Sequence, residues 1–240
     1  MAIILKEKIR LTHKYYLKSK KEKRKFHFQL ASYTLLFLIL IFSISYYYGL
    51  YFLPFISIWL TLMILAPFID VPTLVKKEKI NYYSQLLLAE NQKNNSITIH
   101  GGTLFDYYFI FDNRSNGPER KKFILQQYLE GLLNLIKEHE KTSDKNLNIK
   151  GTTYIINENT GKKLGFKSNK PDFVQMIILI LNYPNLLLTK SIANNKLSFP
   201  NLTNIRTYEA SLDELKLNKG KIENINNRLK STIANNGYRK

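Results

Sequence analysis

The sequence predicts a membrane protein made of an N-terminal two-helix transmembrane hairpin and a C-terminal α+β domain. Three observations predict this: a long uncharged apolar run, Lys-rich segments on both sides of it, and strand-like and helix-like patterns that alternate over the rest of the chain. The 240 residues then divide into a basic juxtamembrane segment at 1–25, the hairpin at 26–70 and a cytosolic domain at 71–240. We expect that domain to fold on its own.

The hairpin is predicted from residues 26–69, which contain no Lys, Arg, Asp or Glu. One helix of this length would measure about 66 Å, whereas the hydrocarbon core of a bilayer is only about 30 Å thick. Two helices at 27–47 and 51–69 therefore fit better. Gly49 lies where a turn is needed, and Pro54 falls in the first turn of the second helix, where its missing N–H costs little.

The charged flanks predict the orientation of the hairpin. Cations precede and follow it, whereas the turn is uncharged; they are Lys18, Lys20, Lys21, Lys23, Arg24, Lys25, Lys76 and Lys77. Lys and Arg next to spans mark the cytoplasmic side, so both termini are expected there, at the cytoplasmic membrane in a bacterium. The same side chains are expected to contact anionic lipid headgroups, at about 1 kcal/mol each. A topology signal with no other role would also explain them.

The overall composition excludes some classes of protein and leaves others open. The formal net charge of +18 suggests nucleic acid, but outside residues 1–25 the excess of Lys is diffuse, so nucleic-acid binding is disfavoured without being excluded. The chain has no Cys, which excludes a disulfide framework and thiolate metal ligands.

The first half of the domain is expected to contain two strands, a helix and a third strand. Residues 96–100 and 103–111 read as strands joined by a two-residue turn at Gly101 and Gly102. Because the second of these strands is apolar on both faces, it is expected inside the sheet. A helix follows over 117–141 and a strand over 149–157, after which Gly161 and Gly165 indicate a turn.

The second half is expected to contain a long helix from 171, a strand at 204–209 and a C-terminal amphipathic helix at 211–234. The last helix starts at a capping-box pattern, Ser211 followed by Glu214, and Leu215, Ile222 and Leu229 recur every seven residues. The complete order is ββαβαβα, a small, mostly antiparallel sheet with helices on one side. Copies of the chain are predicted to associate through the hairpin or through this last helix.

The apolar run at 173–188 has three interpretations. It spans 16 residues and contains Gln175, Asn182, Pro184 and Asn185. A membrane span needs about 20 residues, so a third span is disfavoured and a buried core helix is the prediction. A helix against the bilayer surface is the remaining alternative.

Two residues are candidates for a functional site, His100 and Asp106. Asp106 is a carboxylate in a predicted aromatic strand, where such a group needs polar partners or has a functional role. The predicted hairpin would put Asp106 near Ile97 and His100 opposite Thr103, so a site with both is conceivable. The simpler interpretation is an Asp paired with a Lys or Arg at a sheet edge. The sequence lacks G-x-S-x-G, H-E-x-x-H, G-x-G-x-x-G and the phosphate-binding loop, so no cofactor or metal is predicted.

Two function classes follow from these features. The first is a membrane-anchored binding, sensing or scaffold protein without recognisable catalytic machinery, whose cytosolic domain binds a protein or small ligand. The second is a membrane-tethered enzyme that acts on a lipid or an acidic ligand, with a site around His100 and Asp106. The missing catalytic motifs favour the first class. A basic pocket without a paired acid and base would favour ligand binding, whereas a pocket with His100 and Asp106 would favour the enzyme.

Overall fold

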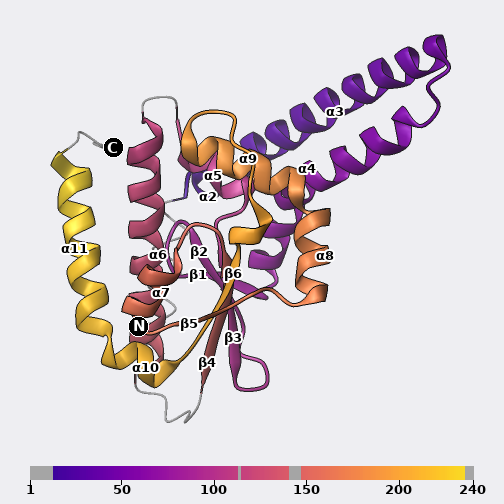
Figure 1. Ribbon diagram of the computed structural model, residues 1–240. Helices are drawn as coiled ribbons and strands as arrows, with labels where there is room; N and C mark the ends of the chain where they lie inside the picture. The colour runs from indigo at the N-terminus through magenta and orange to yellow at the C-terminus, as the bar shows by residue number, and fades with distance from the viewer. Residues whose placement is uncertain (1–12, 113–114, 141–146, 236–240) are drawn as a thin grey trace.

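The computed structural model describes residues 13–112, 115–140 and 147–235, and it begins with a short helix and two long ones (Figure 1). They are α2 (Lys14–Leu17), α3 (Lys20–Tyr48) and α4 (Leu53–Lys76). Both α3 and α4 are long and apolar enough to cross a membrane, and α3 turns into α4 after Gly49, which adopts a left-handed conformation with φ 69°. α3 extends beyond the predicted 27–47 at both ends, whereas α4 begins two residues later than the predicted 51–69 and ends seven residues later. Ser19 and Glu22 form a capping box, so the Lys-rich residues 20–25 are the first turns of α3.

The rest of the chain forms a six-stranded mixed sheet. Its strands are β1 (Ile80–Tyr82), β2 (Leu87–Glu90), β3 (Ser96–Gly101), β4 (Asn148–Thr153), β5 (Lys167–Asn169) and β6 (Arg206–Ser211). The spatial order is β1-β2-β3-β4-β6-β5, with β3 and β4 parallel and the other neighbours antiparallel.

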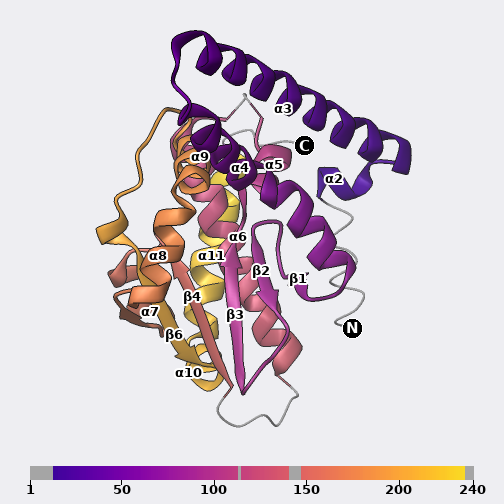
Figure 2. The same ribbon diagram turned by 90° about the vertical axis from the view of Figure 1, so that its right-hand side faces the viewer.

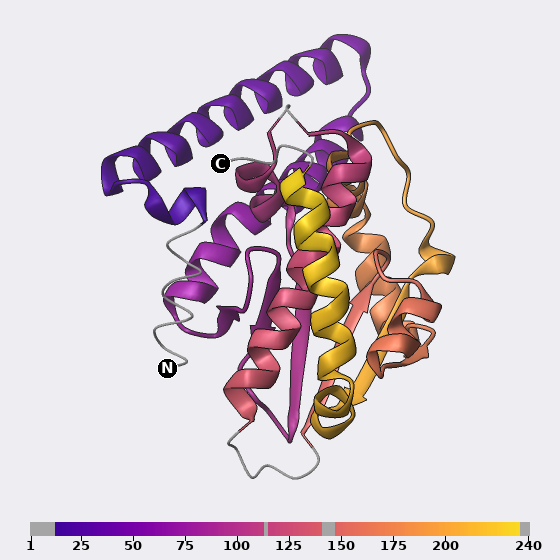
Figure 3. The same cartoon turned by 90° about the vertical axis from the view of Figure 1, so that its left-hand side faces the viewer.

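Helices lie on both faces of this sheet. They are α5 (Leu104–Ile110), α6 (Gly117–His139), α7 (Glu158–Leu164), α8 (Phe173–Leu181), α9 (Tyr183–Asn194), α10 (Leu212–Leu217) and α11 (Lys219–Asn235), with a 3-10 turn at Leu202–Asn204. α6 and α11 lie side by side over one face, as Figure 3 shows. On the other face, the end of α4 packs on α5 and on β1 near the β1–β2 edge. α8 lies on that same side of the sheet, toward the viewer in Figure 2.

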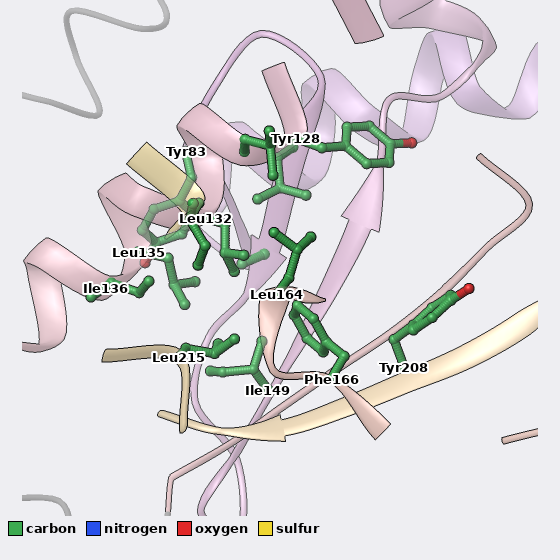
Figure 4. Close-up of a cluster of buried hydrophobic side chains, with 14 of the residues drawn as sticks. Tyr83, Tyr128, Leu132, Leu135, Ile136, Ile149, Leu164, Phe166, Tyr208 and Leu215 are labelled. Carbon is green, nitrogen blue, oxygen red and sulfur yellow. The ribbon is translucent and has the colours of Figure 1, made fainter. Parts of the chain in front are cut away.

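Two hydrophobic clusters result from this arrangement. The larger one fills the space between the sheet and α6, α10 and α11 (Figure 4). The second, which we call the hairpin-base cluster, joins the hairpin to the domain and consists of Tyr15, Phe68, Val71, Val75, Tyr82, Leu88, Leu104, Phe105 and Phe109. Strand β2 belongs to both, because successive side chains of a strand point to opposite faces: Leu87 enters the larger cluster and Leu88 the hairpin-base cluster.

The α+β class is confirmed, but the predicted element order is not. Helix 117–141 and the strands at 149–157 and 204–209 correspond to α6, β4 and β6. The strands β1, β2 and β5 were not predicted, the turn at 161–165 is largely helix α7, and the C-terminal helix is divided into α10 and α11 at Asn218. The prediction of helices on only one side of the sheet is wrong.

The return strand predicted at 103–111 is also wrong, because these residues form α5. Thr103 and Asp106 make a capping box at its start. This cap, together with the burial of Phe105 and Phe109 four residues apart on one helix face, outweighs the strand preference of the aromatic residues. Gly101 and Gly102 are not a hairpin turn. A Cβ on Gly101 would overlap the hydroxyl of Tyr128, so glycine is needed there for close packing.

The long helix predicted over the apolar run is broken. α8 and α9 meet at Asn182 with a bend of 70°, and Pro184 occupies the first turn of α9. The prediction that this run is buried in the core is wrong for α8, where Phe173 is 79% exposed and Val174 is 65% exposed.

We predict that Phe105→Ala destabilises the full-length protein strongly, because Phe105 is fully buried in the hairpin-base cluster. Removing a buried Phe side chain costs about 3–5 kcal/mol. Thermal unfolding in nanodiscs measures the loss. Leu217→Ala is the control, since Leu217 is 85% exposed and its truncation should leave the melting temperature almost unchanged. Equal melting temperatures for the two variants would contradict this assignment of α5.

Candidate functional site

Asp106 lies in the first turn of α5 and is fully buried. Its Oδ2 accepts hydrogen bonds from the backbone N–H of Thr103 at 2.7 Å and from the Thr103 hydroxyl at 2.9 Å. Its Oδ1 accepts a hydrogen bond from the Tyr82 hydroxyl on β1. Burial and the neighbouring Asp106 hold the pKa of Tyr82 well above its usual value, so Tyr82 keeps the proton that it donates.

His13 completes the surroundings of Asp106 from the N-terminal side. Its Nε2 lies 3.3 Å from Oδ1 of Asp106, and its ring stacks on Phe105 with 5.3 Å between centroids. The Nδ1 of His13 accepts the backbone N–H of Tyr15 at 3.3 Å, whereas its buried Nε2 makes no hydrogen bond within the described residues. Asp106 therefore contacts groups from three separate parts of the chain, and it is hydrogen-bonded to two of them, Thr103 and Tyr82.

His100 has other partners. It lies on β3 opposite Leu88, and its Nε2 is 2.8 Å from Oε1 of Glu90. The predicted neighbours of Asp106, Ile97 or a Lys or Arg at a sheet edge, are wrong, as is the pairing of His100 with Thr103. One signal could have corrected this: Thr103 and Asp106 have the same capping-box spacing that predicted the helix at Ser211. No local pattern pointed to His13.

A cleft of about 540 Å³ lies mainly on the sheet face opposite α6. Strands β3 and β4, the start of α5, and helices α8 and α9 form its walls. Tyr128 of α6 also reaches the cleft, and Pro67 of α4 lies at its edge. Its polar lining residues are Thr98, His100, Thr103, Tyr107, Tyr128, Lys150, Thr152, Thr153, Tyr154, Gln175, Asn182, Asn185 and Thr189. None of the described residues around the cleft is an Asp or Glu.

Most polar side chains of the cleft are neutral hydrogen-bonding groups. Burial raises the pKa of the phenols of Tyr107, Tyr128 and Tyr154, so they stay protonated at neutral pH. The two basic side chains at the cleft are paired with carboxylates outside it: Lys150 with Glu209 at 3.1 Å and His100 with Glu90. The cleft thus offers hydroxyl and amide groups, without an acid and a base that face each other.

Asn185 links the cleft to the hairpin. Its Nδ2 donates to the backbone carbonyl of Met63 and to Oδ1 of Asn182, both at 2.7 Å. The Met63 carbonyl needs this donor, because its normal helical partner would be the N–H of residue 67, which is Pro. Because these two partners are both acceptor oxygens, the group that faces them is the NH₂ of Asn185 and not its Oδ1. Asn185 Oδ1 is buried and has no hydrogen-bond partner among the residues that the structure describes, and Asn185 lines the cleft.

The predicted lipid-contact residues lie at the base of the hairpin. Lys20, Lys21, Arg24 and Lys25 are exposed in the first turns of α3, and Lys76 and Lys77 are exposed at the end of α4. Lys18 and Lys23 are half-buried. Lys23 Nζ donates to the Tyr16 carbonyl at 3.2 Å and lies 5.3 Å from the centre of the Tyr15 ring, so this side chain also fixes α2.

Comparison of the chain with protein-family models, with curated proteins and with solved structures gives no match. Within the described residues, no group of three His, Asp or Glu side chains is placed to hold a metal ion.

We predict that Asp106→Asn destabilises the protein by about 1–3 kcal/mol, because one carboxylate oxygen becomes an NH₂ group that faces a hydrogen-bond donor. Thermal unfolding in nanodiscs measures this loss. The control is Asp213→Asn at an exposed position of α10, where the change should stay within about 0.5 kcal/mol. A loss no larger than that of the control would show that Asp106 is not the structural centre described above.

We predict a coupling between Asn185 and Pro67. Asn185→Ala alone leaves the Met63 carbonyl without a donor, which costs about 1–3 kcal/mol. In a Pro67→Ala background the new N–H of residue 67 supplies that hydrogen bond, so the same change should cost less. A double-mutant cycle on melting temperature measures the difference. Equal losses in both backgrounds would contradict the role given to Asn185.

Proposed function

We propose that this chain is a membrane-anchored ligand-binding protein. The hairpin anchors it in the bilayer, with both termini on the cytoplasmic side, and the cleft binds a small polar molecule. The cleft itself supports this proposal most directly. Its volume of about 540 Å³ lies within the range of small-molecule sites, and its lining combines apolar walls with hydroxyl and amide groups.

The ligand is expected to carry a hydrogen-bond donor such as a hydroxyl or an amine. The reason is Asn185 Oδ1, a buried acceptor without a partner at the cleft. A buried acceptor left unpaired costs about 1–3 kcal/mol, and a donor on the ligand would remove that cost. The same amide holds α4, so a ligand at Asn185 would act on the packing of the hairpin. This makes ligand sensing the specific form of the proposal.

The hairpin part of the proposal is supported by the length and apolar character of α3 and α4 and by the exposed cations at their base. Positive charge on both flanks and none at the turn favours a cytoplasmic position for both ends. The cations would contact anionic headgroups. Association of copies through the hairpin or α11 belongs to the same proposal.

The enzyme alternative was suggested by a site that contained both His100 and Asp106, but each of these residues has other partners. His100 is paired with Glu90, and Asp106 is enclosed by Tyr82, Thr103 and His13. Both oxygens of Asp106 are already used by protein donors. The arrangement thus favours binding over catalysis.

The test is to identify the ligand in the full-length protein. The chain is purified from its host membranes into nanodiscs, and the released small molecules are compared by mass spectrometry with those of empty nanodiscs. We expect one molecule enriched with the protein. Thr98→Trp should fill the cleft and abolish the enrichment, whereas Lys167→Trp, at an exposed strand position outside the cleft, should retain it. Enrichment that survives Thr98→Trp, or no enrichment at all, would contradict the proposal.

A further inference from the structure

Helix α8 has an apolar surface that the domain does not cover. None of its nine residues is charged. Six of them are large apolar residues with 41% or more of their surface exposed: Phe173, Val174, Ile177, Ile178, Ile180 and Leu181. Gln175 and Leu179 instead line the cleft, so one side of α8 belongs to the domain and the other side has no partner in the described chain. An exposed apolar patch of this density marks an interaction surface.

The position of α8 identifies that partner. α9 follows α8 directly and is bonded to α4 through Asn185 and Met63. Met63 lies inside the apolar part of α4, five residues before Phe68 of the hairpin-base cluster. The C-terminal end of α8 therefore lies at the level at which the hairpin meets the domain. It lies on the side of the domain toward which α3 and α4 project (Figure 1) and faces the viewer when that side is seen in Figure 2.

We propose that α8 lies in the cytoplasmic interface of the bilayer, with its six exposed apolar side chains in contact with lipid. The inference rests on the membrane anchoring proposed above. Because α8 lies on the side of the domain from which the hairpin projects (Figure 1), we assign its exposed apolar side chains to the bilayer rather than to a protein partner. Interfacial helices bury their apolar face about 5–10 Å into the boundary between headgroups and acyl chains.

The ends of α8 suit this position. Asp172 caps the helix and accepts the backbone N–H of Gln175 at 2.7 Å, so its carboxylate is occupied by the helix start. Lys170 is exposed two residues earlier and can reach lipid phosphates. The 70° bend after α8 turns the chain from the interface into α9 and back to the domain. One wall of the cleft, formed by α8, would then be held by the membrane itself.

The test measures the depth of single labels in liposomes. The chain has no Cys, so one Cys can be introduced at each chosen position and labelled with a fluorophore. The α8 positions are Val174→Cys and Ile178→Cys, four residues apart. Leu40→Cys in α3 is the control for an inserted hairpin. Leu217→Cys in α10 is the control for an exposed Leu on the end of the domain away from the hairpin (Figures 1 and 2).

Quenching by nitroxides at two depths in the lipid gives the position of each label. We expect the α8 labels about 5–10 Å below the phosphates, Leu40 deeper, and Leu217 unaffected. Quenching at Leu40 without quenching at α8 would overturn the inference and leave the anchoring intact. No quenching at Leu40 would contradict the anchoring, and the inference with it. Cross-linking of α8 to a second copy, with no quenching by lipid, would overturn the inference in favour of a dimer contact.

Discussion

The burial of Asp106 is the constraint on which the junction between hairpin and domain depends. An ionised carboxylate loses several kcal/mol on leaving water, and it is tolerated only where donors replace the water. Here the donors come from the cap at Thr103 and from Tyr82 on β1, and the ring of His13 ahead of α2 lies 3.3 Å from the same carboxylate and covers it. All three parts of the chain must be in place together to enclose Asp106. The aromatic rings around them then pack on Phe68, Val71 and Val75 of α4.

This constraint changes the expected relation between the two parts of the molecule. From sequence, the domain at 71–240 is expected to fold alone. In the structure, Leu88 and Phe105 are buried by the end of α4 and by Tyr15. A chain without residues 1–72 would expose these side chains and remove His13 from Asp106. The base of the hairpin thus packs into the domain, and Asn185 at the cleft is hydrogen-bonded to Met63 of α4.

The features that the sequence predicts well are those with local causes. The two long apolar helices follow from composition, α6 from its periodicity, and β4 and β6 from runs that contain β-branched residues. The features that it missed depend on distant contacts. Strand β2 is apolar on both faces because two different clusters bury it, and its residues Leu87, Leu88 and Ala89 have no alternation to reveal a strand. Asp106 looked isolated in sequence because its partner His13 lies 93 positions away.

The central claim is that the base of the hairpin and the cleft-bearing domain open as one cooperative unit. Native-state hydrogen exchange of the full-length protein in nanodiscs, at increasing denaturant, tests it most directly. We expect the amides at 68–76 in α4, those of β2 and those of α5 to converge on one opening free energy. Exchange in β2 and α5 at a clearly lower free energy, while the end of α4 stays protected, would show two independent parts and contradict this account.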